Sequence, residues 1–113
     1  MKNCLFCKII KGDIPSTKIY ENEYVYAFAD IEPQAPFHAI IVPKEHISSA
    51  DEINAGNSHY IAKIFEAVAA IAKQENLENG YRVVNNCGKD GGQTVGHIHF
   101  HLLARRNLAW PPG

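Results

Sequence analysis

The sequence has little net charge, no long apolar run and few cysteines. Its 11 basic residues nearly balance its 12 acidic residues, which excludes a broad electrostatic surface for nucleic acid or for anionic membranes. No stretch is long and apolar enough to span a membrane, and residues 1–11 lack the apolar core of a signal peptide. We therefore expect a cytoplasmic protein that binds neither nucleic acid nor membrane and holds any anionic ligand locally.

Cysteine is too scarce for a disulfide framework. The three cysteines are Cys4, Cys7 and Cys87, and the first two form a Cys-x-x-Cys pair. In a reducing compartment this spacing indicates a metal site or a redox pair more than a structural disulfide. A tetrahedral structural zinc site would need two further ligands.

The length and the patterning predict one α+β domain over residues 1–113. A hydrophobic content of 46% is enough for a single core. Helical spacing of apolar residues predicts a short helix over residues 4–11 and a long helix over residues 58–76. The runs that read as strands are 18–21, 24–30, 38–43, 81–85 and 97–103. Because the strands are grouped, we expect an antiparallel sheet of about five strands with two helices on one side.

Three histidines alternate with apolar residues near the C-terminus, at His97, His99 and His101. Side chains two residues apart on a strand share a face, so a strand here would align the three imidazoles. Such a row could bind a catalytic metal. Alternatively, one imidazole could attack an electrophile while its neighbours move protons or stabilise negative charge. The composition does not separate these two readings.

A glycine-rich loop precedes the histidines. Gly91 and Gly92 let the backbone approach an anion closely, and consecutive amides, with the Gln93 amide and the Thr94 hydroxyl, could bind phosphate oxygens. A glycine pair is also common in an ordinary tight turn. Next to three histidines, it favours phosphoryl or nucleotidyl transfer, in which positioning and charge stabilisation dominate.

These features resemble the histidine-triad (HIT) superfamily. Residues 97–103 match its signature, in which three histidines alternate with apolar residues and two apolar residues close the motif. The similarity runs almost end to end and is closest to the histidine-triad nucleotide-binding (Hint) branch, in its bacterial type with an N-terminal Cys-x-x-Cys. The other matching segments are 6–10, 30–38, 43–47, 91–95 and 110–113.

The resemblance implies a HIT-like fold, an assembly and an activity. The assembly is a homodimer in which the two sheets join into one continuous sheet. The activity is hydrolysis of purine nucleoside 5'-phosphoramidates, or of acyl-nucleotides, through a nucleotidyl-histidine intermediate. The implied partner is a purine mononucleotide or a nucleoside phosphoramidate, and no cofactor is implied for catalysis.

Carried over to this sequence, the resemblance assigns the catalytic residues. His99 would be the nucleophile, His101 would contact the phosphate, and His38 would complete the proton network. Thr94 would act beside the phosphate and the leaving group. The remaining residues expected around the phosphate are Asn86, Gly92 and Gln93.

The same resemblance assigns the nucleoside site. Asp30 would accept hydrogen bonds from both ribose hydroxyls, which suits a carboxylate. The apolar slot for the base would be made by Leu5, Phe6, Phe28 and Ile31. Simpler roles are open for some of these residues, since Asp30 could cap the proline loop and Phe28 and Ile31 could be ordinary core residues.

For the cysteine pair, the resemblance implies a structural zinc site. His46 and His97 would complete the ligand set with Cys4 and Cys7. The alternative is a pair of partly buried free thiols. With zinc bound here, His99 and His101 would remain free for catalysis.

The chain departs from the family pattern at several positions. The usual Gly-Gly-Arg is replaced by Ala104-Arg105-Arg106, which adds charge and stiffens the backbone. Gly96 stands where a bulky or aromatic residue is common, which would leave the site more open. Counting back from His97 favours Asn86 over the adjacent Asn85 as the site residue.

Two rival functions remain at this point. One is a dinucleoside polyphosphate hydrolase of the same superfamily. The other is a non-catalytic nucleotide-binding or adaptor protein, in which the triad only holds a mononucleotide. The tail around Trp110 and the proline loop that ends at His38 favour the phosphoramidase.

Overall fold

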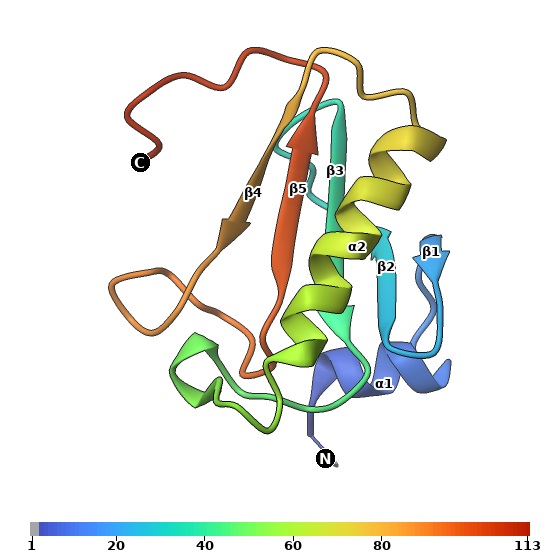
Figure 1. Cartoon of the computed structure of the whole chain (residues 1–113), viewed down its shortest axis with the longest axis vertical. Coiled ribbons are helices and arrows are strands. Elements are labelled where there is room, and N and C mark those ends of the chain that lie inside the picture. The colour runs from blue at the N-terminus through green and yellow to red at the C-terminus, as the bar shows by residue number, and fades with distance from the viewer. Residues whose placement is uncertain (1–2) are drawn as a thin grey trace.

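The computed structural model describes residues 3–113 as a five-stranded antiparallel sheet with two α-helices (Figure 1). In chain order the elements are α1 (Leu5–Lys11), β1 (Lys18–Glu21), β2 (Val25–Ala29), β3 (Phe37–Pro43), the 3-10 helix η1 (Ala50–Glu52), α2 (His59–Gln74), β4 (Tyr81–Asn85) and β5 (Phe100–Ala104). The strand order across the sheet is β1-β2-β3-β5-β4. The predicted α+β class and the five-stranded antiparallel sheet are therefore confirmed.

Strand β3 lies at the centre of the sheet. All seven of its residues are buried, as expected for a continuous apolar run that ends at a proline. In its pairing with β5, Ile40 lies opposite His101 and His38 lies opposite Leu103. Diagonal neighbours on one face of an antiparallel pair can touch, so this register brings His38 beside His101.

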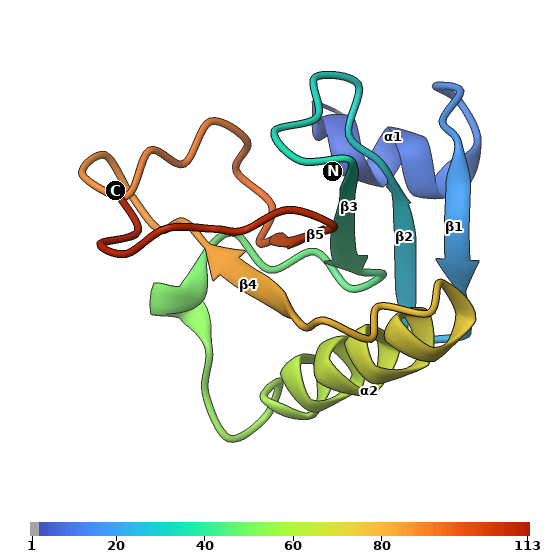
Figure 2. The same cartoon turned by 90° about the horizontal axis from the view of Figure 1, so that it is seen from above.

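The two helices cover opposite faces of the sheet, and the expectation of both on one side is wrong (Figure 2). The face under α1 packs Phe6 and Ile9 against Tyr26, Phe28 and Ile40. The face under α2 holds the alternate residues of the same strands. These are Val25, Ala27, Ala39 and Ile41. Because strand side chains alternate, β2 and β3 contribute to two separate apolar clusters.

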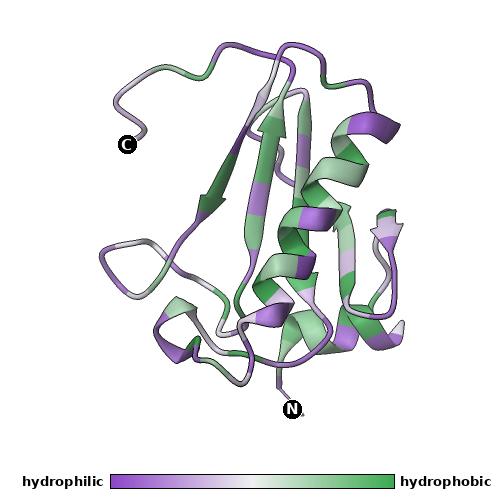
Figure 3. Cartoon of the chain, in the orientation of Figure 1, coloured by the Kyte–Doolittle hydropathy of each residue, from purple (hydrophilic) through white to green (hydrophobic). Residues whose placement is uncertain are grey.

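Helix α2 forms the larger of the two layers. Its residues Ile64, Val68 and Ile71 are at most 2% exposed and repeat at helical spacing, so one apolar stripe faces the sheet. Figure 3 shows the hydropathy of these elements: β3 and β5 are largely hydrophobic, and polar residues lie between the apolar ones along α2. In residues 3–113, no helix has the length and apolarity needed to cross a membrane.

Helix α1 is short and is defined by its ends. Cys4 caps its N-terminus, where the Sγ atom accepts a hydrogen bond from the backbone N–H of Cys7 at 3.4 Å. Gly12 ends it in the left-handed conformation at φ 86°, which glycine adopts without steric cost. The cap therefore fixes the first cysteine of the Cys-x-x-Cys pair relative to the second.

The histidine row is only partly a strand. Strand β5 begins at Phe100, so the expected strand over 97–103 is wrong for its first three residues. The backbone N–H of Ile98 donates instead to the carbonyl of Ile47 at 2.6 Å, outside the ladder with β3. Because the chain joins the sheet only at Phe100, the His97 side chain can point away from the other two imidazoles.

Candidate active site

A cavity of about 910 Å³ lies between α1, the sheet and the loop that follows β4. It gathers most of the residues that the sequence assigned to nucleotide binding and catalysis. These are Leu5, Phe6, Phe28, Asp30, Ile31, Asn86, Gly92, Thr94, His99 and His101. Of the remaining assignments, His38 lies buried directly behind His101, and Gln93 is not part of the cavity wall.

One end of the cavity is apolar. Phe6 and Phe28 are both buried and meet edge to face, with ring centroids 5.6 Å apart. These two rings belong to the core and also line the cavity, so the two roles considered for Phe28 are not exclusive. Ile31 is 93% exposed at the rim and is no core residue. A flat aromatic ring would fit this end of the cavity.

Backbone geometry fixes the protonation of His99. The Nδ1 atom of His99 lies 2.9 Å from the carbonyl oxygen of His97. A carbonyl oxygen only accepts hydrogen bonds, so Nδ1 must carry the proton. In the neutral ring, the lone pair is then on Nε2. The ring itself is held edge to face against Phe6 at a centroid distance of 5.0 Å.

Asn85 supports the same histidine from behind. Its Nδ2 donates to the carbonyl of His99 at 2.9 Å, while Asn86 faces the cavity. The structure thus places the two adjacent asparagines in different positions, with Asn86 on the wall, as the count from His97 favoured. The sequence does not predict the contact of Asn85 with the His99 carbonyl, because strand alternation shows only that the side chains of Asn85 and Asn86 point in opposite directions.

A second set of contacts fixes the other two imidazoles. The backbone N–H of Gln34 donates to Nδ1 of His38 at 3.0 Å, so the neutral His38 ring carries its proton on Nε2. That Nε2 lies 2.8 Å from Nδ1 of His101 and donates to it. His101 must then carry its own proton on Nε2. The His101 ring therefore offers an N–H at the cavity, and the separately fixed His99 ring offers a lone pair.

Asp30 lies beside this chain and serves two purposes. One carboxylate oxygen accepts from the backbone N–H of Glu32 at 2.8 Å, which is the loop-capping role considered from the sequence. The other oxygen is 3.3 Å from Nε2 of His38. The carboxylate also lines the cavity, so its capping role leaves it available to a ligand there.

Burial favours the uncharged form of His38 and His101. Desolvation lowers the pKa of His38 below its ordinary value, against the opposing effect of Asp30. The pKa of His101 is lowered by burial first and then by the neighbouring His99 and His38. Neutral rings can act as nucleophile and proton carrier near pH 7, whereas charged rings could not attack.

Asp30, His38 and His101 together resemble a metal-binding triad, because their donor atoms lie within 4.8 Å of one another. The tautomer of His38 argues against that role. Its Nδ1 lone pair is taken by the N–H of Gln34, so its Nε2 atom carries hydrogen and offers no lone pair to a metal. The cluster is therefore arranged for proton positioning.

The loop between β4 and β5 differs from the expected phosphate nest. The amide of Gly92 donates to the carbonyl of Lys89 at 3.1 Å, and the amide of Gln93 donates to that of Gly88 at 3.0 Å. Both amides are thus hydrogen-bonded inside the loop, and their assignment to phosphate binding stays a prediction. The side chain of Gln93 is also engaged, since its Nε2 donates to the carbonyls of Ser48 and Val95.

Gly91 has a packing role in this loop. A Cβ atom at position 91 would lie 2.7 Å from the backbone nitrogen of Cys87, which is too close for two atoms that are not bonded. The glycine pair therefore shapes the turn, and the shaped turn places Gly92 and Thr94 on the cavity wall. Of the polar groups predicted for the phosphate end, the Thr94 hydroxyl and the Asn86 amide remain in place.

The four residues proposed as metal ligands form a second cluster. Nδ1 of His97 lies 3.2 Å from Sγ of Cys4 and 3.6 Å from Sγ of Cys7, and Nδ1 of His46 lies 3.4 Å from Sγ of Cys7. Ligand atoms around tetrahedral zinc lie about 3.4–3.8 Å apart, which follows from the usual Zn–N and Zn–S lengths. The cluster fits zinc in both donor type and spacing.

His97 is oriented for this cluster. Its Nε2 donates to the carbonyl of Pro43 at 2.9 Å, which leaves the lone pair on Nδ1, facing the cysteines. Burial lowers the pKa of His97 to about 4, so its ring is neutral and able to bind a metal. Burial and the neighbouring Cys4 raise the pKa of the Cys7 thiol, so forming the thiolate costs free energy. A bound cation would offset that cost. A row of three histidines on one metal is excluded by this geometry.

Arg105, which stands at a position of the usual glycine pair, and the following Arg106 have identifiable contacts. Arg105 has a φ of 72° and donates to the carbonyl of Glu75 at 2.8 Å. Arg106 donates from Nε to the carbonyl of Gln34 at 3.0 Å. Gln34 is the residue whose amide fixes His38, so Arg106 supports the proton chain from outside the cavity. Sequence spacing gave no signal for this contact, which joins segments 72 residues apart.

Comparison with known proteins agrees with this geometry. The family model described as the HIT domain matches residues 11–108. The 14 kDa zinc-binding protein of Zea mays is 49% identical over 96% of this chain and 87% of its own length. The adenylylsulfatase HINT1 of Arabidopsis thaliana is 39% identical over 96% of this chain and 76% of its own length.

A solved structure gives the same fold. The HIT family hydrolase from Legionella pneumophila Philadelphia 1 superposes with a TM-score of 0.95 at 48% identity, covering 98% of this chain and all of that one. The fold and these relatives define the class as that of the HIT-domain proteins. The chain belongs to the HIT domain family.

Proposed function

We propose that this protein hydrolyses the P–N bond of purine nucleoside 5'-phosphoramidates, and related acyl-nucleotides, through a nucleotidyl intermediate on His99. The observation that carries the proposal is the contact between Nδ1 of His99 and the carbonyl of His97. It leaves a nucleophilic lone pair on Nε2 of a residue that lines the cavity. The HIT family hydrolase and adenylylsulfatase relatives support hydrolysis at an adenylyl phosphorus.

The nucleoside would lie along the larger cavity. The Phe6 and Phe28 end takes the purine base, and the Asp30 carboxylate accepts the ribose hydroxyls. This orientation directs the phosphate to the opposite end, where Asn86, Thr94 and His101 can donate hydrogen bonds to its oxygens. Of these donors, His101 is held in place by its contact with His38.

In the first step, Nε2 of His99 bonds to phosphorus while the P–N bond breaks and its electron pair goes to nitrogen. The leaving amine takes up one proton, which the His38 and His101 pair is placed to supply from solvent. In the second step, water attacks phosphorus, returns that proton to solvent and releases His99. The sum is phosphoramidate plus water giving nucleotide plus amine.

Replacement of the nucleophile tests this proposal. With adenosine 5'-phosphoramidate as substrate, His99→Ala is expected to lower kcat by about 10³-fold or more, because the covalent route is lost. Its affinity for AMP should change by less than about tenfold, since Asp30 and the aromatic slot remain. Release of AMP and calorimetric binding of AMP provide the two measurements.

The matched control is His59→Ala, which removes an exposed histidine at the start of α2. This variant should keep native turnover, and native turnover should persist with a chelator present. A native protein that binds AMP but releases none from the phosphoramidate would contradict the enzyme and favour a nucleotide-binding module.

We further propose that the Cys4, Cys7, His46 and His97 cluster binds one structural zinc ion. The support is the donor spacing, the orientation of His97 and the likeness to a 14 kDa zinc-binding protein. Zinc would tie α1 to the segment before β5 and so hold the approach to His99. A cytoplasmic location is expected with it, because the cysteines must stay reduced.

Protein purified without chelator should contain about one zinc per chain by elemental analysis. Cys4→Ser should remove the zinc and lower the melting temperature, because a tetrahedral site that loses one thiolate binds metal far more weakly. Cys87→Ser, at a cysteine outside the cluster, should keep both. A native chain without zinc, and with the same melting temperature as Cys4→Ser, would count against this site.

We also propose that two chains associate as a homodimer along β4, which is an outer strand of the sheet. Trp110 is 81% exposed in a tail that Arg82 of β4 holds through the carbonyls of Leu108 and Ala109. Phe65 on α2 and Tyr81 on β4 are also large apolar side chains that are partly exposed. A second copy of the chain would cover these side chains and extend the sheet.

Sedimentation velocity tests the assembly. The chain has a mass of 12.6 kDa, so the dimer should sediment at about twice that mass. Trp110→Ala should weaken the association because it removes the largest exposed side chain in the tail. A native protein that remains at the mass of one chain at high micromolar concentration would refute the dimer.

A further inference from the structure

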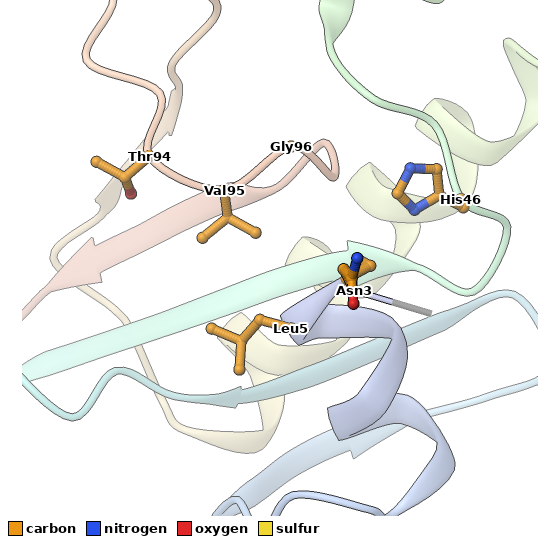
Figure 4. Close-up of a pocket in the computed structure, with 7 residues that line it drawn as sticks. Asn3, Leu5, His46, Thr94, Val95 and Gly96 are labelled. Atoms are coloured by element: carbon orange, nitrogen blue, oxygen red, sulfur yellow. The ribbon is translucent and has the colours of Figure 1, made fainter. Parts of the chain in front are cut away.

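A second cavity, of about 570 Å³, reaches the Cys/His cluster, which is the set Cys4, Cys7, His46 and His97. Two members of the cluster, Cys4 and His46, belong to its wall. The other lining residues are Asn3, Leu5, Thr94, Val95 and Gly96. Figure 4 shows that Thr94, Val95 and Gly96 follow one another along one segment of this wall, while Leu5 and His46 come from other segments. A small solute that enters the cavity therefore meets the Cys4 side chain.

Gly96 keeps this cavity open. Within residues 3–113, no heavy atom outside the adjacent residues lies within 4 Å of the place that a Cβ at position 96 would take. The φ angle of Gly96 is outside the left-handed region, so the backbone does not require a glycine there. A larger side chain could be carried at this position, and it would occupy part of the space beside Cys4.

The two thiols of the cluster are placed to react with each other. Cys4 caps helix α1 and Cys7 follows three residues later, so one helical turn holds both side chains on the same side. Both are free thiols of intermediate burial, and their sulfur atoms lie within 4.8 Å of each other. A Cys-x-x-Cys pair has the spacing at which dithiols close to a disulfide.

The two thiols differ in access and in hydrogen bonding. Cys4 lines the second cavity, whereas Cys7 is not part of its wall. Nδ1 of His97 carries the lone pair of that ring, because Nε2 donates to the carbonyl of Pro43. The thiol of Cys4 therefore donates to Nδ1 of His97, at 3.2 Å. Cys4 is the thiol that a solute meets first, and Cys7 is the second thiol behind it.

We propose that Cys4 and Cys7 are a modification site, a dithiol that hydroperoxides oxidise to a disulfide. In the first step, the sulfur of Cys4 attacks an oxygen of hydrogen peroxide and the O–O bond breaks. The thiol proton leaves with the departing oxygen as water, and Cys4 becomes a sulfenic acid. In the second step, the sulfur of Cys7 attacks the sulfur of Cys4, the S–O bond breaks and a second water leaves. Two thiols and one peroxide thus give one disulfide and two waters.

This site goes beyond the proposed hydrolysis and does not require it. The disulfide and a bound metal exclude each other, because the oxidised sulfurs are no longer thiolate ligands. Oxidation would therefore release the proposed zinc ion. The same two thiols are present in a chain without metal, so the reaction with peroxide depends only on their spacing and on access through the cavity.

The variant Cys87→Ser tests the chemistry, since it leaves Cys4 and Cys7 as the only cysteines. After treatment with hydrogen peroxide, the intact mass should fall by two hydrogen atoms and both thiols should disappear from a thiol titration. Dithiothreitol should restore both, because a disulfide is reversible and a sulfinic acid is not. Retention of both thiols, a disulfide between two chains, or a gain of oxygen that dithiothreitol does not reverse would each overturn the inference.

Two further variants, made in the Cys87→Ser background, test access through the cavity. Gly96→Tyr should slow disulfide formation by about tenfold or more, and the control Gly96→Ala by less than about threefold, because only the tyrosine ring fills the space beside Cys4. In denaturant, all three proteins should oxidise at one rate. An unchanged rate in folded Gly96→Tyr would overturn the role of the cavity.

Elemental analysis of the same samples separates this inference from the proposed zinc site. Protein that carries zinc should release one ion for each disulfide formed. A reversible disulfide in native protein that never contained zinc would support the dithiol and count against the zinc site. Zinc that stays bound while both thiols are lost would overturn the assignment of Cys4 and Cys7 as the oxidised pair.

Discussion

The site depends on backbone groups that decide which nitrogen of each buried imidazole carries a proton. The carbonyl of His97 fixes His99, the amide of Gln34 fixes His38, and the carbonyl of Pro43 fixes His97. A backbone carbonyl cannot donate and a backbone amide cannot accept, so each contact admits only one neutral tautomer. Three histidines with similar side chains thereby acquire different chemical roles.

The sheet makes these contacts possible. Pairing of β3 with β5 places His38 diagonally beside His101, and the buried central strand keeps water away from the His38 ring. The early end of β5 at Phe100 separates His97 from the other two imidazoles and turns it to the cysteines. One short motif therefore serves both the cavity and the Cys/His cluster, and a metal at the cluster would brace His99, the proposed nucleophile, two residues away.

The sequence predicted the elements well because their apolar spacing is regular. The strands of the sheet and the long helix lie within a few residues of their expected positions, since Ile64, Val68 and Ile71 repeat at helical spacing and β3 is continuously apolar. The expectation that α1 lies on the same side of the sheet as α2 was wrong. The apolar spacing in a seven-residue helix shows that one side of the helix is buried, but it does not indicate which face of the sheet the helix covers.

The details of the site were less accessible from the sequence. Alternation of histidines was taken to mean a strand, although alternate residues can also continue past the end of a hydrogen-bonded ladder. The amides of Gly92 and Gln93 were assigned to phosphate, but they satisfy carbonyls of their own loop. The contacts of Asn85 and Arg106 use main-chain oxygens, for which a side-chain pattern carries no signal.

The central claim concerns proton positions, and nitrogen-15 NMR of the imidazole rings at pH 7 measures them directly. The account predicts a proton on Nδ1 and none on Nε2 for His99, with the reverse arrangement in His38 and His101. The pKa values of His38 and His101, which burial lowers, further predict that both rings stay neutral to a lower pH than an exposed histidine. A proton on Nε2 of His99, with Nδ1 bare, would contradict the account, because the atom that attacks phosphorus in the proposed reaction would then have no lone pair.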